Sequence, residues 1–324
     1  MCMKSRNQIN IEFKEYVGSI LSKYATSVYK VEYPGGETRG SIDFVVKTNN
    51  NQLLLVKVSV NIDDIGREEV EELKALARCL NASPIVIGLW DKHGDLEDDV
   101  VYDKQGVYAV TPAALAGLLR GESGMIIISK KGGYFASIDS KKLRMLREVR
   151  SMSLGEVADK VGVTRKTIYE YERGRLDVSI DAATKLVELF GEEILKPINP
   201  VSSVHMSEYK GLGSKPDDPA EVAIIHEVRN EGDIAHSKRT PLDLSIKLGS
   251  RRAGIVVRHK RDYKRLIQRA RGLSAISRLA NLNGFALIDD APERGLRIDL
   301  EDLNIEIIEK KEYKSLLKSL KEES

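Results

Sequence analysis

The side chains with the clearest chemistry lie near the middle of the chain, in the segment RKTIYEYERG that begins at Arg165. Cationic, hydroxyl and aromatic groups at neighbouring positions are the donors, acceptors and flat apolar surfaces that read base edges in the major groove of DNA. Ile168 and Tyr171 lie three residues apart, so a helix would bury them and turn the polar groups outward. The predicted base-reading residues are Arg165, Lys166, Thr167 and Tyr169.

Two short helices are predicted ahead of this segment. Leu143, Leu146 and Val149 recur every three residues and form the apolar stripe of a first helix that ends near residue 150. Ser153 followed by Glu156 is a capping box, in which each side chain satisfies a backbone N–H group at the start of a second helix.

A glycine sets the turn between the second helix and the helix that carries the base-reading groups. Gly162 stops the second helix, because glycine readily adopts the positive φ that so sharp a turn requires. Thr164 caps the third helix, Gly174 ends it, and Ser179 caps a fourth. Short helices joined in this way form a helix-turn-helix, whose second helix contacts bases through its first turn.

Basic residues gather around these helices, although the net charge of the chain is only +2. Residues 141–175 hold ten lysines and arginines against five acidic residues. Such a cluster attracts the phosphate backbone of DNA whatever the base sequence. The predicted phosphate contacts are Arg144, Arg147, Arg150, Lys160 and Arg173. A second basic segment, 251–271, leaves open both a solvated face and a second contact with the DNA backbone.

Residues 153–174, SLGEVADKVGVTRKTIYEYERG, resemble the Cro and lambda-repressor type of helix-turn-helix. Leu154 departs from the pattern, because the family usually places there a glutamine that helps to fix the DNA backbone. The resemblance implies a homodimer that presents two third helices to half-sites about one helical turn apart. The matching residues are Ser153, Val157, Ala158, Gly162, Val163, Thr164, Ile168, Tyr171, Glu172 and Gly174.

The N-terminal part carries residues that could hold a metal ion and activate water. Asp43 and Lys57 lie on predicted neighbouring strands, after a predicted helix, 9–23, that contains Glu12. The order of elements resembles the restriction-endonuclease-like fold, in which two carboxylates hold Mg²⁺ beside a lysine. The second carboxylate belongs two residues before the lysine, and Leu55 stands there. We therefore predict no catalytic residue and a fold retained for its shape.

A Mg²⁺-dependent nuclease, targeted by the helix-turn-helix, is the alternative to that prediction. It would need a carboxylate on the next predicted helix, such as Glu68 or Glu72, to replace the missing metal ligand. A third hypothesis is an adaptor whose α/β parts bind a protein or a small effector.

The segment RGSIDFVVK at 39–47 has a counterpart 200 residues later, RTPLDLSIK at 239–247. Similar strands and a helix follow both segments in the same order, which predicts a duplicated α/β module. The predicted fold class is α/β plus all-α, with two restriction-endonuclease-like domains, 1–130 and 201–324, flanking a central four- to five-helix domain, 131–200.

The remaining composition narrows the class of protein. The apolar runs are far shorter than the roughly 20 residues of a membrane span, so we expect a cytoplasmic protein without a membrane partner. Two cysteines and five scattered histidines show no ligand spacing, so we expect no metal and no cofactor. The whole layout resembles an archaeal family of helix-turn-helix transcriptional regulators, which implies double-stranded DNA as partner and regulation of transcription.

Overall fold

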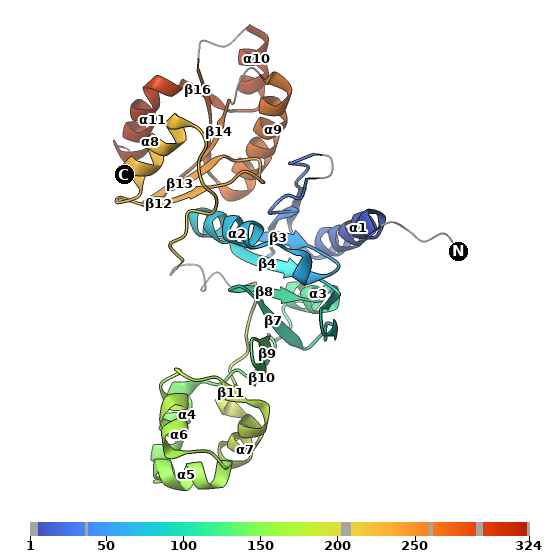
Figure 1. The fold of residues 1–324 in the computed structure, drawn as a ribbon, viewed down its shortest axis with the longest axis vertical. Helices are drawn as coiled ribbons and strands as arrows, with labels where there is room; N and C mark the ends of the chain where they lie inside the picture. Colours follow the sequence, from blue (N-terminus) through green and yellow to red (C-terminus); the bar gives the residue numbers. More distant parts are fainter. Residues whose placement is uncertain (1–5, 36–37, 202–208, 259–261, 290–293, 323–324) are drawn as a thin grey trace, which may run out of the picture.

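The computed structural model describes residues 6–35, 38–201, 209–258, 262–289 and 294–322. Three lobes follow one another along the longest axis of the molecule (Figure 1). The N-terminal α/β lobe lies in the middle, with the C-terminal α/β lobe at one end and the helical lobe at the other. Among the described residues, no helix is both long and apolar enough to cross a membrane.

The N-terminal lobe is built on a nine-stranded sheet. β1 to β3 are antiparallel, and β3, β4 and β8 are parallel to one another. The spatial order of the strands is β1 (Ser27–Lys30), β2 (Phe44–Lys47), β3 (Leu53–Val58), β4 (Ser83–Ile87), β8 (Val107–Val110), β7 (Val100–Lys104), β9 (Ile127–Lys130), β10 (Gly133–Ala136) and β11 (Val178–Ser179). A separate two-stranded hairpin joins β5 (Trp90–Asp91) to β6 (Gly94–Asp95).

Helices cover both faces of this sheet, as the alternation of strands and helices predicts. α1 (Arg6–Tyr24) and α3 (Pro112–Arg120) share one apolar core with Phe44, Val46 and Leu54. α2 (Arg67–Leu80) packs on the opposite face, against Val45 and Leu55. The predicted helix at 9–23 is therefore confirmed to within a few residues.

The C-terminal lobe contains a five-stranded sheet with the same succession of two antiparallel and two parallel pairings. Its strands are β12 (Asp233–His236), β13 (Leu244–Leu248), β14 (Arg251–Val257), β15 (Asn283–Ile288) and β16 (Glu306–Glu309). One face packs against α8 (Pro219–Val228) and α11 (Tyr313–Glu322), and the other against α9 (Tyr263–Ala280) and α10 (Arg294–Asp302).

Each α/β lobe packs one of its helices against the sheet of the other lobe. α2 of the N-terminal lobe packs against β12 and β13, while α9 of the C-terminal lobe packs against β1 and β2. Their apolar side chains form one continuous core, which includes Leu73 of α2 and Leu273 of α9. Glu72 is buried in this interface, where its carboxylate accepts hydrogen bonds from the hydroxyls of Ser41 and Ser237. The two lobes therefore share one core and a buried polar contact.

The helical lobe contains the four predicted helices, α4 (Ser140–Val149), α5 (Leu154–Val161), α6 (Arg165–Glu172) and α7 (Ile180–Phe190). The predicted caps are confirmed at Ser153, Thr164 and Ser179, and Asp139 caps α4. Val149 does not lie in the buried stripe, because its side chain is 74% exposed. Residues spaced by three drift by about 60° per step around a helix of 3.6 residues per turn, so the third member leaves the buried face.

Paired strands connect the helical lobe to the N-terminal sheet. The predicted boundary at 130/131 falls inside the β9–β10 hairpin, and β11 of the helical lobe pairs with β10. The segment after α7 returns to the N-terminal lobe, where Val201 is buried. The sheet therefore extends up to the helical lobe.

Candidate nucleic-acid interface

α6 is anchored by its apolar side and presents its polar side to solvent. Ile168 is completely buried and Tyr171 is 4% exposed, in a core shared with Val157 and Leu186. Gly162 turns the chain between α5 and α6 with φ of +82°, a conformation that is easily reached only without a Cβ atom. The turn and the buried pair fix the orientation of the opposite side of α6.

The predicted base-reading residues lie together on that opposite side. Arg165, Lys166 and Tyr169 are exposed, whereas Thr167 is half-buried. The Thr167 hydroxyl lies 2.8 Å from the hydroxyl of Thr164, which caps the helix through the backbone N–H of Thr167. The Arg173 guanidinium donates to the Tyr169 hydroxyl and lies 5.2 Å from the centre of its ring. The first turn of α6 thus offers two unobstructed cations beside a flat aromatic group.

Arg147, predicted to contact phosphate, is instead bound inside the helical lobe. Its guanidinium makes a bidentate pair with Glu172, with N–O distances of 2.5 and 2.9 Å, and donates to the carbonyl of Met152 at 3.0 Å. The hydrogen bond with Glu172 raises the pKa of the Arg147 guanidinium. Both side chains are largely buried, so this pair ties α4 to the end of α6.

The other predicted phosphate contacts divide into two groups. Arg150 is turned towards α7, where it donates to the carbonyl of Leu189 and stacks 5.4 Å from the ring centre of Phe190. Arg150 itself is exposed, and so are Arg144, Lys160 and Arg173, which are not bonded to another helix in the described part of the chain. Of these three, Arg144 pairs with Glu148 one turn along α4, an interaction that is weak at an exposed site.

The predicted nuclease positions do not form an open metal site. Asp43 accepts from the backbone N–H of Val58 at 2.7 Å and lies 2.5 Å from the ammonium of Lys14 on α1. The ammonium of Lys57 lies 3.5 Å from Asp43 and 3.1 Å from Glu69. All the charged groups except Lys14 are almost completely buried. Two carboxylates and two cations therefore already neutralise one another.

Glu12, Glu68 and Glu72, the acidic residues that the nuclease alternative considered, lie at other places in the structure than the ion pairs of Asp43 and Lys57. Glu12 lies on the exposed side of α1 and accepts from Gln8, so Lys14 is the α1 residue next to Asp43. Glu68 pairs with Arg239 at the surface, and Glu72 lies at the lobe interface, so Glu69 is the α2 carboxylate next to Lys57. Leu55 is completely buried in the apolar core.

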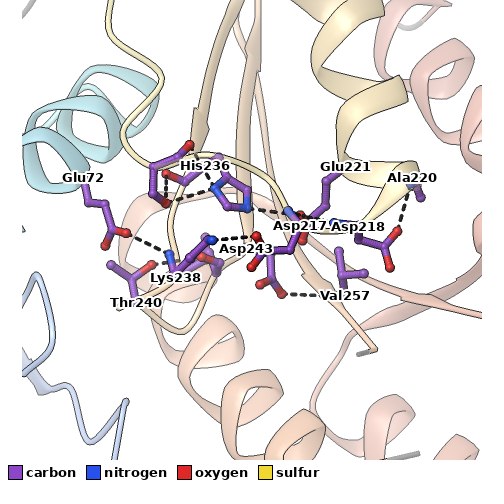
Figure 2. A network of polar contacts seen from close by, with 12 residues as sticks. Glu72, Asp217, Asp218, Ala220, Glu221, His236, Lys238, Thr240, Asp243 and Val257 are labelled. Atoms are coloured by element: carbon purple, nitrogen blue, oxygen red, sulfur yellow. Dashed lines mark hydrogen bonds and ion pairs between the residues drawn. The ribbon is translucent and has the colours of Figure 1, made fainter. Parts of the chain in front are cut away.

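The C-terminal lobe places an aspartate in the equivalent position. Asp243 accepts from the backbone N–H of Val257 at 2.7 Å, as Asp43 does from Val58, and Figure 2 shows this bond beside the end of β14. The guanidinium of Arg269 on α9 lies 2.5 Å from the Asp243 carboxylate. Arg269 is thus the cation paired with Asp243, as Lys57 is paired with Asp43. Figure 2 also shows Glu72 reaching this region from the N-terminal lobe, where it accepts from the backbone N–H of Lys238.

Sequence comparisons identify the relatives of this chain. Residues 13–123 match the model of a PD-(D/E)XK superfamily domain, and residues 143–196 match a helix-turn-helix model. Three archaeal proteins with the printed name "Putative HTH-type transcriptional regulatory protein" align over most of the chain. The protein from Pyrococcus horikoshii is 35% identical over 72% of each chain, and that from Aeropyrum pernix is 34% identical over 80% of each chain. The protein from Thermococcus gammatolerans is 30% identical over 85% of this chain and 84% of its own length.

The chain belongs to this archaeal family of HTH-type transcriptional regulatory proteins. The predicted family resemblance is confirmed, together with the helix-turn-helix and the nuclease-like N-terminal domain. No solved structure matches the chain.

The sequence alone does not predict the ion pairs of two buried carboxylates of this HTH-type family member, Glu172 and Glu69. Glu172 matches the helix-turn-helix pattern, and that match was the only available signal that it has a fixed role. Glu69 lies twelve residues beyond Lys57, and no local pattern separates it from Glu68, Glu71 and Glu72 on the same helix. Only the packing of α2 on the sheet selects Glu69 as the neighbour of Lys57.

Proposed function

We propose that the chain is a sequence-specific DNA-binding regulator of transcription that reads the major groove with α6. The observation that supports this proposal most strongly is the exposed first turn of α6, with Arg165 and Lys166 presented by a rigid, capped helix-turn-helix. Arginine and lysine at such a position donate to the O6 and N7 acceptors of guanine. Tyr169 adds an apolar surface of the kind that contacts a thymine methyl group.

Phosphate contacts in this proposal come from the exposed cations that are not bonded to another helix of the described helical lobe. Arg144, Lys160 and Arg173 are exposed on the helical lobe, and we propose them as partners of the DNA backbone. Arg147 and Arg150 take a different role, because their guanidinium groups bind Glu172 and the carbonyl of Leu189. Arg147 ties α4 to α6, and Arg150 ties the end of α4 to α7.

Salt dependence distinguishes these two groups. Lys160→Gln and Arg173→Gln should each lower the slope of log affinity against log salt by about 0.9, because each removes one phosphate contact. Both should weaken binding to all duplexes alike, as measured by fluorescence anisotropy from about 50 to 200 mM salt. Arg278→Gln, a change at an exposed position of α9, is the matched control and should leave the slope unchanged. Unchanged slopes in both test variants would remove these two residues from the interface.

We further propose that the protein binds as a homodimer. The described residues contain one helix-turn-helix, whereas a specific site usually comprises two half-sites about one helical turn apart. Met145 and Val149 lie exposed one turn apart on α4. Two such apolar surfaces can meet in antiparallel orientation across a two-fold axis.

The α/β lobes act as a scaffold in this proposal, and we propose that the second is a degenerate repeat of the first. The same order of strand pairings, and the matching bonds of Asp43 and Asp243, support a common origin. Asn81 and Asn281 end the corresponding helices α2 and α9 in the same left-handed conformation. The domain division at 1–130, 131–200 and 201–324 remains part of this proposal.

The alternative, a Mg²⁺-dependent nuclease, has the match to a PD-(D/E)XK superfamily domain in its favour. We expect no cleavage of supercoiled plasmid by the full chain in Mg²⁺ or Mn²⁺, because Lys57 and Lys14 occupy the carboxylate oxygens of Asp43 and Glu69. Agarose gels of the wild type and of Asp43→Ala give the comparison. Nicking by the wild type that disappears in Asp43→Ala would establish the nuclease instead.

A further inference from the structure

The helical lobe is joined to the N-terminal lobe by a narrow neck of two hydrogen-bonded segments. Residues 125–139, which lead into the helical lobe, pair through their backbone with residues 194–198, which lead back to the N-terminal lobe. The backbone N–H groups of Asp139, Lys196 and Ile198 donate to the carbonyls of Ile194, Ser137 and Met125, respectively, at 2.6 to 3.0 Å. The two-residue strand β11 adds one further pairing, with β10. The orientation of the helical lobe therefore depends on a small number of backbone contacts.

A cavity of about 460 Å³ lies in this neck. Its lining comes from both bodies, because Tyr108 and Ile128 belong to the N-terminal sheet, whereas Ser140 and Leu176 belong to the helical lobe. Lys196 and Ile198 of the returning segment complete it. The volume falls within the range of about 300 to 1,000 Å³ that holds small ligands in proteins.

The charges around the cavity favour an anion. Lys130 is paired with Asp177 at 2.6 Å, so these two lining side chains neutralise each other. Lys196 is exposed, and no carboxylate of the described part of the chain lies within ion-pair distance of its ammonium. The hydroxyl of Ser137 adds a donor in the lining.

The remaining lining is mostly apolar, and Ser140 and Asn199 are its polar members. Ile128, Leu176 and Ile198 contribute aliphatic side chains, and Tyr108 contributes a partly buried ring. Such a mixture suits a ligand with a compact apolar body and one charged end, since apolar walls hold the body and a few polar groups fix its orientation.

We propose that this cavity binds a small amphipathic organic anion, a carboxylate or a phosphate ester, with its charge at Lys196 and its apolar body against Tyr108, Ile128 and Leu176. The ligand would touch the sheet and the helical lobe together and would stiffen the neck. The expected change in DNA affinity on ligand binding rests on the DNA-binding function proposed above. Ligand binding itself does not depend on that function.

The first experiment titrates the full chain with benzoate and with phenyl phosphate by saturation-transfer NMR, with benzamide as the neutral counterpart. We expect saturable binding of one or both anions, with a dissociation constant of about 1 mM for ligands with so few atoms, and none of benzamide. Binding of one anion only identifies the head group. Failure of both to saturate, or equal binding of benzamide, would overturn the proposal.

Variants locate the site. Lys196→Gln should weaken binding about tenfold, whereas Lys131→Gln, at the exposed turn of the β9–β10 hairpin, should leave it unchanged. Ser137→Phe should fill the cavity and abolish binding, with circular dichroism to confirm the fold. If Lys131→Gln weakened binding as strongly as Lys196→Gln, or if a folded Ser137→Phe variant bound normally, the anion would not occupy this cavity.

The second experiment separates the site from its consequence. Anisotropy of a fluorescent duplex is measured with and without the anion that binds. A change in DNA affinity that is absent in Lys196→Gln supports regulation through the neck. An unchanged DNA affinity rejects regulation and leaves the binding site in place, and a protein that binds no duplex rejects the DNA-binding function instead.

Discussion

Replacing Arg165 by alanine is expected to remove most of the discrimination between the cognate base and its competitors at one position of the operator. The guanidinium lies on the exposed first turn of α6, where a bidentate contact to guanine contributes about 1 to 3 kcal/mol. The ratio of specific to mismatched affinity should therefore fall by about 5- to 150-fold, as measured by competition anisotropy with duplexes that differ at single positions.

Arg173→Ala is the matched control for this change, since it removes an arginine from the same lobe. We expect it to weaken all duplexes alike, because a phosphate contact carries no base information. Arg165 would lose its base-reading role if its alanine variant kept the single-position preferences of the wild type.

The second large effect concerns the buried pair of Arg147 and Glu172. Glu172→Leu leaves the Arg147 guanidinium with only the exposed Glu148 carboxylate, 3.6 Å away, as an ion-pair partner, and removing the buried partner of such a pair typically costs about 3 to 5 kcal/mol. The helical lobe should open far more often as a result. Hydrogen exchange of the full chain, followed by mass spectrometry, should show exchange about 100- to 1,000-fold faster in peptides of α4 and α6. Peptides of the C-terminal sheet are the internal reference.

The double variant Arg147→Met, Glu172→Leu tests the cause of that loss. Removing both charges and filling the space with apolar side chains should restore much of the protection, because the penalty comes from the unpaired charge. If Glu172→Leu alone left exchange in α6 unchanged, the pair would not hold the helices together.

Local chemistry explains why the helical lobe could be predicted closely from the sequence. The capping residues Asp139, Ser153, Thr164 and Ser179 act on backbone groups within three residues, so their effect is contained in short segments. The same holds for Gly162, whose positive φ follows from the turn that it makes.

Contacts between distant segments explain the failures. Glu172 meets Arg147 across 25 residues, and neither residue marks the other in the sequence. β9 and β10 were missed as strands because each has four residues and their partners include β7 and β11, which lie elsewhere in the chain. The turn between them, Lys131-Gly132-Gly133, did carry a hairpin signal, since both glycines adopt positive φ.

The nuclease-like lobe was predicted in outline but not in its ion pairs. The sequence placed Asp43, Leu55 and Lys57 on adjacent strands, and in the structure Leu55 and Lys57 lie on β3 while Asp43 immediately precedes β2. It could not show that Lys14 and Glu69 converge on the same point, because that depends on how α1 and α2 pack on opposite faces of the sheet.

Selection of bound sequences from a random pool of duplex DNA tests the central proposal most directly. The full chain, at moderate ionic strength, should enrich an inverted repeat whose half-site centres lie about 10 base pairs apart, with guanine at a fixed position of each half. A pool that stays random through successive rounds would contradict the proposal that the exposed face of α6 reads DNA.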